Sequence, residues 1–202
     1  MSRTITPTSI LIGDGRYYDF RNPSLDGVDV RFLARAISRI CRFTGHCDRF
    51  YSVAEHSVWV SHLVPSHLAR QALVHDLHEA LVGDVSSPLK GVIGAEYKRL
   101  EQEAWALVAD LCGVPVTVDP LVKRADLVML GVERRKILAN DSGEPWDILR
   151  GIPDVVDEYP GLELGKSSDE AFDFFMNRYE ALPAQPQDAL QVRPRFVASV
   201  AP

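Results

Sequence analysis

The spacing of apolar residues along the chain changes near residue 29. Residues 9–20 alternate between apolar and polar positions and carry Gly-Asp-Gly between two apolar runs, a pattern typical of a small β-hairpin. From Val30 onward, apolar residues recur at every third or fourth position, which is the spacing that lines one face of an α-helix. The pattern therefore predicts an all-α domain with a small N-terminal β-hairpin.

Capping signals divide the helical region into separate helices. Residues suited to N-capping precede most of the apolar runs, and glycine or proline follows several of them. Glu55 follows Ser52 by three residues, which is the pattern of a capping box, so we assign Glu55 a structural role and not a catalytic one. On these signals we expect helices over residues 30–42, 52–64, 67–82, 94–111, 120–140 and from 168 onward.

The chain is long enough to bury one sizeable core, since it has 202 residues of which 46% are hydrophobic. We expect a single domain over residues 1–181, with the hairpin at about residues 9–20. Residues 182–202 are rich in proline and have no helical periodicity, so we expect them to form a terminal tail that is mobile or lies on a neighbouring subunit. This tail and several exposed aromatic residues favour a homo-oligomer.

The charge balance restricts the partners. A net charge of −6 argues against binding to a nucleic-acid polymer or to an anionic membrane surface, but a small phosphate-bearing substrate is compatible with it. The three cysteines form no CxxC pair, which is typical of reduced thiols. The N-terminus has no apolar targeting segment, and no stretch is apolar enough to span a membrane. We therefore expect a cytoplasmic protein.

Several ionisable residues lie inside the apolar pattern of the helix expected over residues 67–82. His75, Asp76 and Glu79 alternate there with leucine and valine. A charge at a core-facing position costs several kcal/mol unless it is paired or bound to a metal ion. A metal ion is one partner that would offset this cost, and a buried salt bridge is another.

Two further residues favour the metal ion. His56 precedes Pro65 by nine residues and His75 follows it by ten, so the two imidazoles lie at similar heights if the flanking helices are antiparallel. Asp126 shares a helical face with Val122 and Met129 and should point inward. A single buried histidine is more often a hydrogen-bonded core residue, but two histidines with two aspartates suit a divalent cation. Imidazole favours Zn, Co, Ni or Fe, and carboxylate admits Mn or Mg.

The pattern of His56, His75-Asp76 and Asp126 resembles the metal-binding signature of the HD-domain phosphohydrolases. The stretches SVAEHS and HDLHEALVGDVSSPLK resemble more closely the bacterial 5′-deoxynucleotidases and their phage relatives, which include triphosphohydrolases acting on dATP. The resemblance covers residues 30–138. It implies a compact HD-domain helical bundle that holds one divalent cation (Co, Mn or Zn, or else Ni, Fe or Mg) and hydrolyses phosphate esters or anhydrides of nucleotides.

The resemblance also implies roles for individual residues. Glu79 and Asp84 would be catalytic, with Glu79 positioning the attacking water or taking its proton and Asp84 contacting the sugar or the leaving group. Arg42 would bind phosphate, and Phe43 would pack on the sugar or base. Phe43 stands where these deoxynucleotidases carry tryptophan, which leaves the sugar and base preference open. The metal ligands implied are His56, His75, Asp76 and Asp126, and further substrate contacts would come from Lys90 and Pro88.

Other functions fit the same residues. A dNTP triphosphohydrolase that releases tripolyphosphate is the main alternative to a monophosphatase. A phosphodiesterase of cyclic dinucleotides or an alarmone hydrolase is a second, although the Gly-Tyr-Pro tripeptide of the cyclic-dinucleotide relatives does not occur here. A helical scaffold that uses the metal only for stability is a third. His78 is expected in a supporting or surface role, and the role of His46 stays open.

Overall fold

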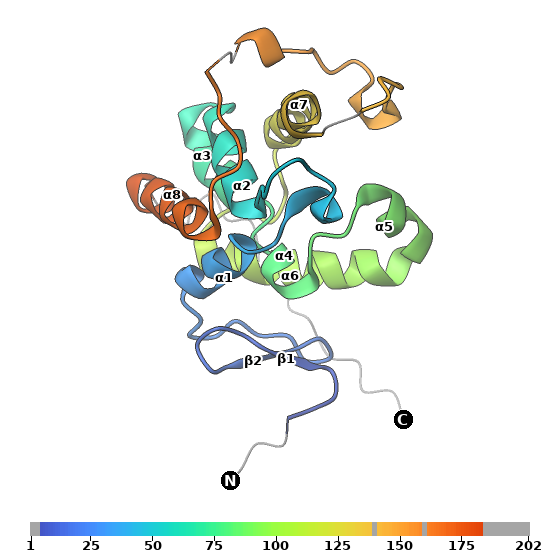
Figure 1. The fold of residues 1–202 in the computed structure, drawn as a ribbon. Coiled ribbons are helices and arrows are strands. Elements are labelled where there is room, and N and C mark those ends of the chain that lie inside the picture. Colours follow the sequence, from blue (N-terminus) through green and yellow to red (C-terminus); the bar gives the residue numbers. More distant parts are fainter. Residues whose placement is uncertain (1–4, 139–140, 159–160, 184–202) are drawn as a thin grey trace.

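The computed structural model describes residues 5–138, 141–158 and 161–183. The predicted tail therefore lies outside the described residues from residue 184 onward, as do the last two residues of the helix expected over residues 120–140. Within these ranges the chain is mostly helical and carries one small antiparallel hairpin, which confirms the predicted fold class (Figure 1). No helix among the described residues is long and apolar enough to cross a membrane.

The hairpin covers one end of the helical core. Strands β1 (Ser9–Leu11) and β2 (Tyr17–Asp19) pair in antiparallel register, with Ile10 opposite Tyr18. Tyr18 is buried against the main core, while Ile10 and Leu11 are exposed. In Figure 1 the two strands lie beneath α1.

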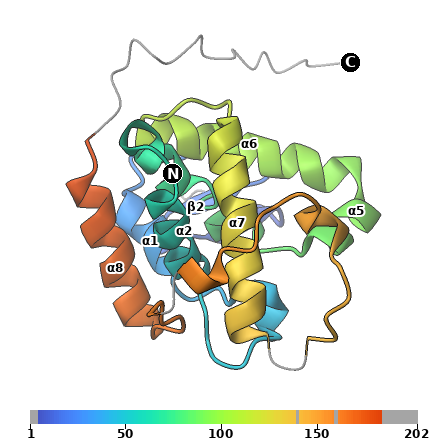
Figure 2. The same ribbon diagram turned by 90° about the horizontal axis from the view of Figure 1, so that it is seen from above.

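The helical region contains a central helix, α2, surrounded by others. Helix α2 contacts α3, α7 and α8, and the side chains of Val53, Ala54, Val58 and Val60 are all fully buried. A helix that is covered on every side lies in the middle of the fold, so a residue such as His56 in α2 is buried by position (Figure 2). The helices are α1 (Val30–Ile37), α2 (Val53–His62), α3 (Ala69–Val74), α4 (Glu79–Val82), α5 (Ser87–Ile93), α6 (Ala95–Cys112), α7 (Pro120–Ile137) and α8 (Ser168–Ala181).

In the described part of the chain, four short 3₁₀ helices connect these elements: η1 (Arg42–Gly45), η2 (Ser66–Leu68), η3 (Asp147–Leu149) and η4 (Val156–Glu158). The predicted N-caps at the starts of four helices are confirmed by side-chain hydrogen bonds. These N-caps are Asp29, Ser52, Asp119 and Ser167. Gly113 ends α6 in the left-handed conformation, with φ of 64°.

The first predicted helix is shorter than expected. Helix α1 ends at Ile37, so Arg42 does not close it and instead begins η1. The reason is a pairing between distant residues: the Arg42 amide donates to the Tyr51 carbonyl at 2.8 Å, and the Val53 amide donates to the Ile40 carbonyl at 3.1 Å. This pairing takes the backbone groups that a longer helix would have used.

The helix predicted over residues 67–82 is interrupted at residues 75–78, between α3 and α4. Amide hydrogen bonds there reach back three residues, as in Leu77 to Val74 and Glu79 to Asp76, both at 3.0 Å. The His75 ring lies with Nδ1 2.7 Å from the Ala72 carbonyl, which a regular α-helix would pair with the amide of residue 76. The interruption therefore coincides with the His75-Asp76 pair.

Helix α5 lies between the helices expected over residues 67–82 and 94–111 and was not predicted. Pro88 lies in its first turn, where a missing amide hydrogen does no harm.

The capping box expected at Ser52 needs correction. Glu55 does not complete a capping box with Ser52. Its carboxylate instead accepts hydrogen bonds from the amides of Gly165 and Lys166, so it anchors the segment that leads into α8.

Candidate metal centre

The four residues predicted as metal ligands come from three parts of the fold. His56 lies on α2, the His75-Asp76 pair lies in the interruption between α3 and α4, and Asp126 lies on α7. Helices α2 and α3 are joined through η2, and the rings of His56 and His75 have centroids 5.4 Å apart. The matched spacing of the two histidines around Pro65 therefore does bring the imidazoles together.

Both aspartates face the two imidazoles. Nε2 of His56 lies 3.1 Å from Oδ1 of Asp126 and 3.7 Å from Oδ2 of Asp76. Nε2 of His75 lies 3.2 Å from Oδ2 of Asp76 and 3.9 Å from Oδ1 of Asp126. One ligand atom each from His56, His75 and Asp126 lies within 4.8 Å of the others, so these three residues could hold a metal ion, with Asp76 beside them.

The orientation of the two rings tests whether a cation fits. Nδ1 of His56 faces Glu133 at 2.5 Å and Nδ1 of His75 faces the Ala72 carbonyl at 2.7 Å, so each ring can donate its proton away from the centre. Both Nε2 atoms are buried and, among the described residues, neither has a hydrogen-bond partner. Two unpartnered nitrogens aimed at two carboxylates are the donor set that a divalent cation requires.

The charge on the aspartates supports the same interpretation. Burial alone would raise the pKa of Asp76, but His75, His56 and Arg42 outweigh it and hold that pKa well below the usual value. Burial also opposes ionisation of Asp126, and the two histidines lower the pKa of its carboxyl. Both groups are therefore carboxylates at neutral pH, the form that coordinates a metal.

Glu133 is a residue of the site that the sequence analysis missed. It lies on α7, two helical turns after Asp126, and its side chain is fully buried. Its carboxylate accepts a hydrogen bond from Tyr51 Oη at 2.8 Å and one from Arg42 Nη2 at 3.2 Å, besides its contact with His56. A spacing of seven residues puts Glu133 on the same helical face as Asp126, and that signal could have identified it.

Glu79 lies at the start of α4, close to the predicted ligands. Its side chain is buried, and Oε2 has no hydrogen-bond partner among the described residues. Burial and the negative charges of Asp76 and Asp84 raise the pKa of Glu79 well above its usual value. A carboxyl whose pKa is raised in this way holds a proton more strongly than an exposed glutamate does, which suits acid–base chemistry.

Asp84 follows Gly83, which has φ of 79° and ends α4. Burial raises the pKa of Asp84 as well, and its side chain lines the same pocket as Glu79. The pocket has a volume of about 770 Å³, which falls in the range of small-molecule sites. Asp76 and Asp126 line this pocket too, so the candidate metal centre opens directly into it.

Arg42 and Phe43 line the pocket from η1. The Arg42 guanidinium is largely buried, 3.2 Å from Glu133 and 3.7 Å from Asp76. Phe43 and its neighbour Thr44 both have positive φ, 57° and 54°, in a region where residues other than glycine are strained. The strained turn therefore places the Arg42 guanidinium and the Phe43 ring along the wall of the same cavity.

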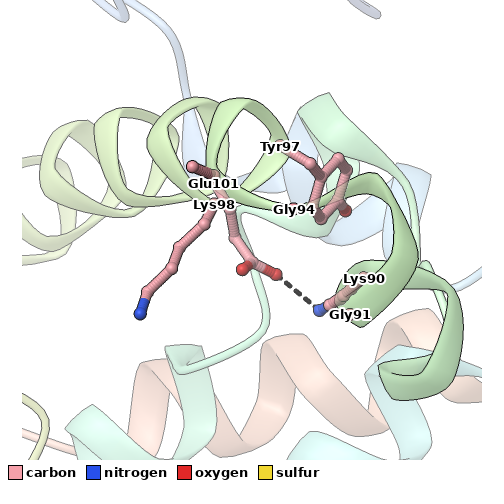
Figure 3. Close-up of a pocket in the computed structure, with 7 residues that line it drawn as sticks. Lys90, Gly91, Gly94, Tyr97, Lys98 and Glu101 are labelled. Carbon is pink, nitrogen blue, oxygen red and sulfur yellow. Dashed lines mark hydrogen bonds and ion pairs between the residues drawn. The ribbon is translucent and has the colours of Figure 1, made fainter.

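Lys90 and Pro88 also line the pocket, from α5. The ammonium of Lys90 already has a partner, because it forms an ion pair of 2.5 Å with Glu101 of α6 (Figure 3). His78 is buried on the same side and faces Glu101 and Trp105, with Nε2 3.8 Å from Glu101. His78 thus lies against α6 and is not a member of the metal-ligand group.

Comparisons with known proteins place these residues in context. The family model described as "HD domain" matches residues 42–115, a range that includes His56, His75-Asp76 and Glu79 but ends before Asp126. The uncharacterized protein YfdR of Escherichia coli K12 is 38% identical over 168 residues, which are 83% of this chain and 92% of YfdR. An uncharacterized protein of Rhodobacter capsulatus is 30% identical over 155 residues, which are 70% of this chain and 79% of that protein.

Proposed function

This chain belongs to the HD-domain family, whose members are generally metal-dependent hydrolases, and we propose that it is a phosphohydrolase acting on deoxynucleotides. The observation that carries the proposal is the pair of unpartnered imidazole nitrogens facing two carboxylates at a pocket lined by Arg42, Glu79 and Asp84. Release of phosphate from deoxynucleoside 5′-monophosphates is the reaction that the sequence resemblance favours.

His56, His75, Asp76 and Asp126 would hold the cation. A divalent cation bound there would act as a Lewis acid, drawing charge from a phosphoryl oxygen and making water a better nucleophile at neutral pH. The protein supplies the fixed geometry, because Glu133 and the Ala72 carbonyl orient the two rings before any ligand arrives.

Three other polar residues of the pocket, Glu79, Arg42 and Asp84, would contact the attacking water, the phosphoryl group and the leaving group. Glu79 lines the pocket beside Asp76 and has a buried oxygen without a partner among the described residues, so we assign it the positioning of the attacking water and the acceptance of its proton. Arg42 would stabilise charge on the transferred phosphoryl group through its forked donors. Asp84 would contact the sugar hydroxyl or the leaving oxygen at the exit of α4.

A monophosphate fits the charges around the pocket better than a triphosphate. A triphosphate needs additional cations beside Arg42, but Lys90 is already paired with Glu101, and binding a further phosphate would require it to leave that partner. A deoxynucleoside triphosphate carries about two more negative charges than the monophosphate, and the net charge of this chain is −6.

The choice between these substrates can be tested with one product assay. The protein loaded with Co²⁺, Mn²⁺ or Zn²⁺ is incubated with dAMP and, separately, with dATP, and the released phosphate and tripolyphosphate are measured. We expect phosphate from dAMP and little product from dATP. Tripolyphosphate from dATP without phosphate from dAMP would assign the triphosphohydrolase reaction instead. Absence of any product with all three metals, from a panel of nucleotides, would indicate a catalytically silent scaffold.

A further inference from the structure

The pocket extends beyond the polar residues, along α7 and away from Asp126. Leu127 and Leu130 follow Asp126 on this helix, and Leu138 lies just after its end. Trp146 and Ile148 line the pocket from the segment around η3, which packs against α7. One part of the cavity is therefore built from carboxylates, His46 and Arg42, and another from apolar side chains and an indole ring.

The Trp146 ring packs against the charged side chain of Arg134. The guanidinium carbon of Arg134, on α7, lies over the Trp146 ring at 4.6 Å from its centre. Arg134 is itself held by two hydrogen bonds to Asp141, at 2.7 and 2.8 Å, and by one to the Glu144 carbonyl at 2.5 Å. Its side chain is mostly buried, so the indole rests on an ordered cation and not on a mobile one.

The distance along α7 matches the shape of a nucleotide. Arg134 follows Asp126 by eight residues, which is about 12 Å along the helix axis at a rise of about 1.5 Å per residue. In a nucleoside 5′-phosphate the base is separated from the phosphate by one sugar ring. A phosphate bound by Arg42 and by a cation held beside Asp126 would place its base one to two helical turns further along α7, towards Leu130 and Trp146.

We propose that Trp146 and the neighbouring apolar residues of α7 form the subsite for the nucleobase, with the base stacked on the indole that Arg134 supports. This inference rests on the proposed function, since it presumes a nucleotide in the pocket. An apolar wall with a pre-oriented aromatic ring suits the face of a planar base, whereas a sugar or a phosphate requires hydrogen-bonding groups. Trp146 thereby takes over the aromatic contact that Phe43 alone was expected to supply.

The test compares two ligands that differ only in the base, deoxyadenosine 5′-monophosphate and 2-deoxyribose 5-phosphate. Binding is measured by calorimetry on metal-loaded Glu79→Gln protein, in which turnover is expected to be slow, and kcat/KM is measured on metal-loaded protein with Glu79 intact. We expect Trp146→Ala to weaken binding of the nucleotide about tenfold and to leave binding of the sugar phosphate unchanged. We expect the same selective loss in kcat/KM.

Three variants make the result specific. Trp146→Phe keeps an aromatic ring and should retain most of the nucleotide affinity, whereas Trp146→Leu keeps apolar bulk without the ring and should lose it. Trp105 lies on α6 outside the pocket, and its indole donates a hydrogen bond to the Val116 carbonyl. Trp105→Phe should therefore change the affinity for neither ligand. Unchanged nucleotide binding in both Trp146→Ala and Trp146→Leu, or an equal loss for both ligands, would overturn the subsite.

The subsite and the proposed function can fail separately. If the metal-loaded protein releases phosphate from neither ligand but Trp146→Ala still loses affinity for the nucleotide alone, the reaction is wrong and the base subsite stands. If both ligands are hydrolysed with the same kcat/KM, and Trp146→Ala changes neither value, the phosphatase reaction stands and the base subsite is overturned.

Discussion

Replacing Glu79 with glutamine is expected to lower kcat about a thousandfold, within the range that general acid–base groups contribute. Glutamine has nearly the same shape as glutamate but cannot accept a proton from water. The Glu79 carboxylate, whose Oε2 has no partner in the described part of the chain, would therefore no longer take the proton of the attacking water. Phosphate release from dAMP by protein loaded with Co²⁺ or Mn²⁺ measures the effect.

The Glu79→Gln variant should still bind the metal, because the predicted ligands are His56, His75, Asp76 and Asp126. Metal content after gel filtration is the control for this point. Glu103→Gln is a matched control, since Glu103 pairs with Arg99 on α6 at some distance from the pocket, and it should keep wild-type turnover. Full turnover in Glu79→Gln would remove Glu79 from the chemistry.

Replacing Glu133 with alanine is expected to have the largest effect on stability. It would leave Arg42, whose side chain is largely buried, without its closest carboxylate, and it would remove the acceptors of Tyr51 and His56. Removing one partner of a buried ion pair typically costs about 3–5 kcal/mol of unfolding free energy. Urea denaturation of the metal-free protein measures this loss, and Glu180→Gln gives the comparison, because its pair with Arg31 is exposed and should contribute less than about 1 kcal/mol.

The conservative variant Glu133→Gln separates stability from metal binding. Glutamine can still accept a hydrogen bond from His56, but it provides no charge to favour the required tautomer and ring orientation. We expect the metal affinity to fall about 10–100-fold, the usual effect of losing a carboxylate that supports a histidine ligand. Titration with Co²⁺, followed by absorbance, measures the affinity. Wild-type affinity in Glu133→Gln would show that the contact with His56 serves stability alone.

The sequence was sufficient for features that depend on local spacing. The capping residues Asp29 and Ser167 identify helix starts without knowledge of the rest of the fold, and the hairpin has an alternating pattern of its own. The approach of His56 and His75 could also be predicted, because it depends only on their distances from the turn at Pro65 and on a short link between helices.

Features that depend on distant pairing could not be predicted in the same way. The turn that carries Arg42 is set by the backbone hydrogen bond to Tyr51, and no local sequence pattern indicates that α1 ends at Ile37. The interruption at His75 arises because a side chain takes a backbone carbonyl, whereas apolar periodicity shows only the helix. Trp146 requires knowledge of how the segment around η3 packs on α7.

We expect phosphate release to require one metal ion, held by the two histidines and two aspartates. The most direct test is to strip the protein of metal and to follow phosphate release from dAMP while Mn²⁺ or Co²⁺ is added in small steps at protein concentrations above the dissociation constant. We expect no turnover without metal, a linear rise of the rate with added metal, and a break at one equivalent per chain. Turnover in the stripped protein, or none at any metal ratio, would contradict metal-dependent phosphate release.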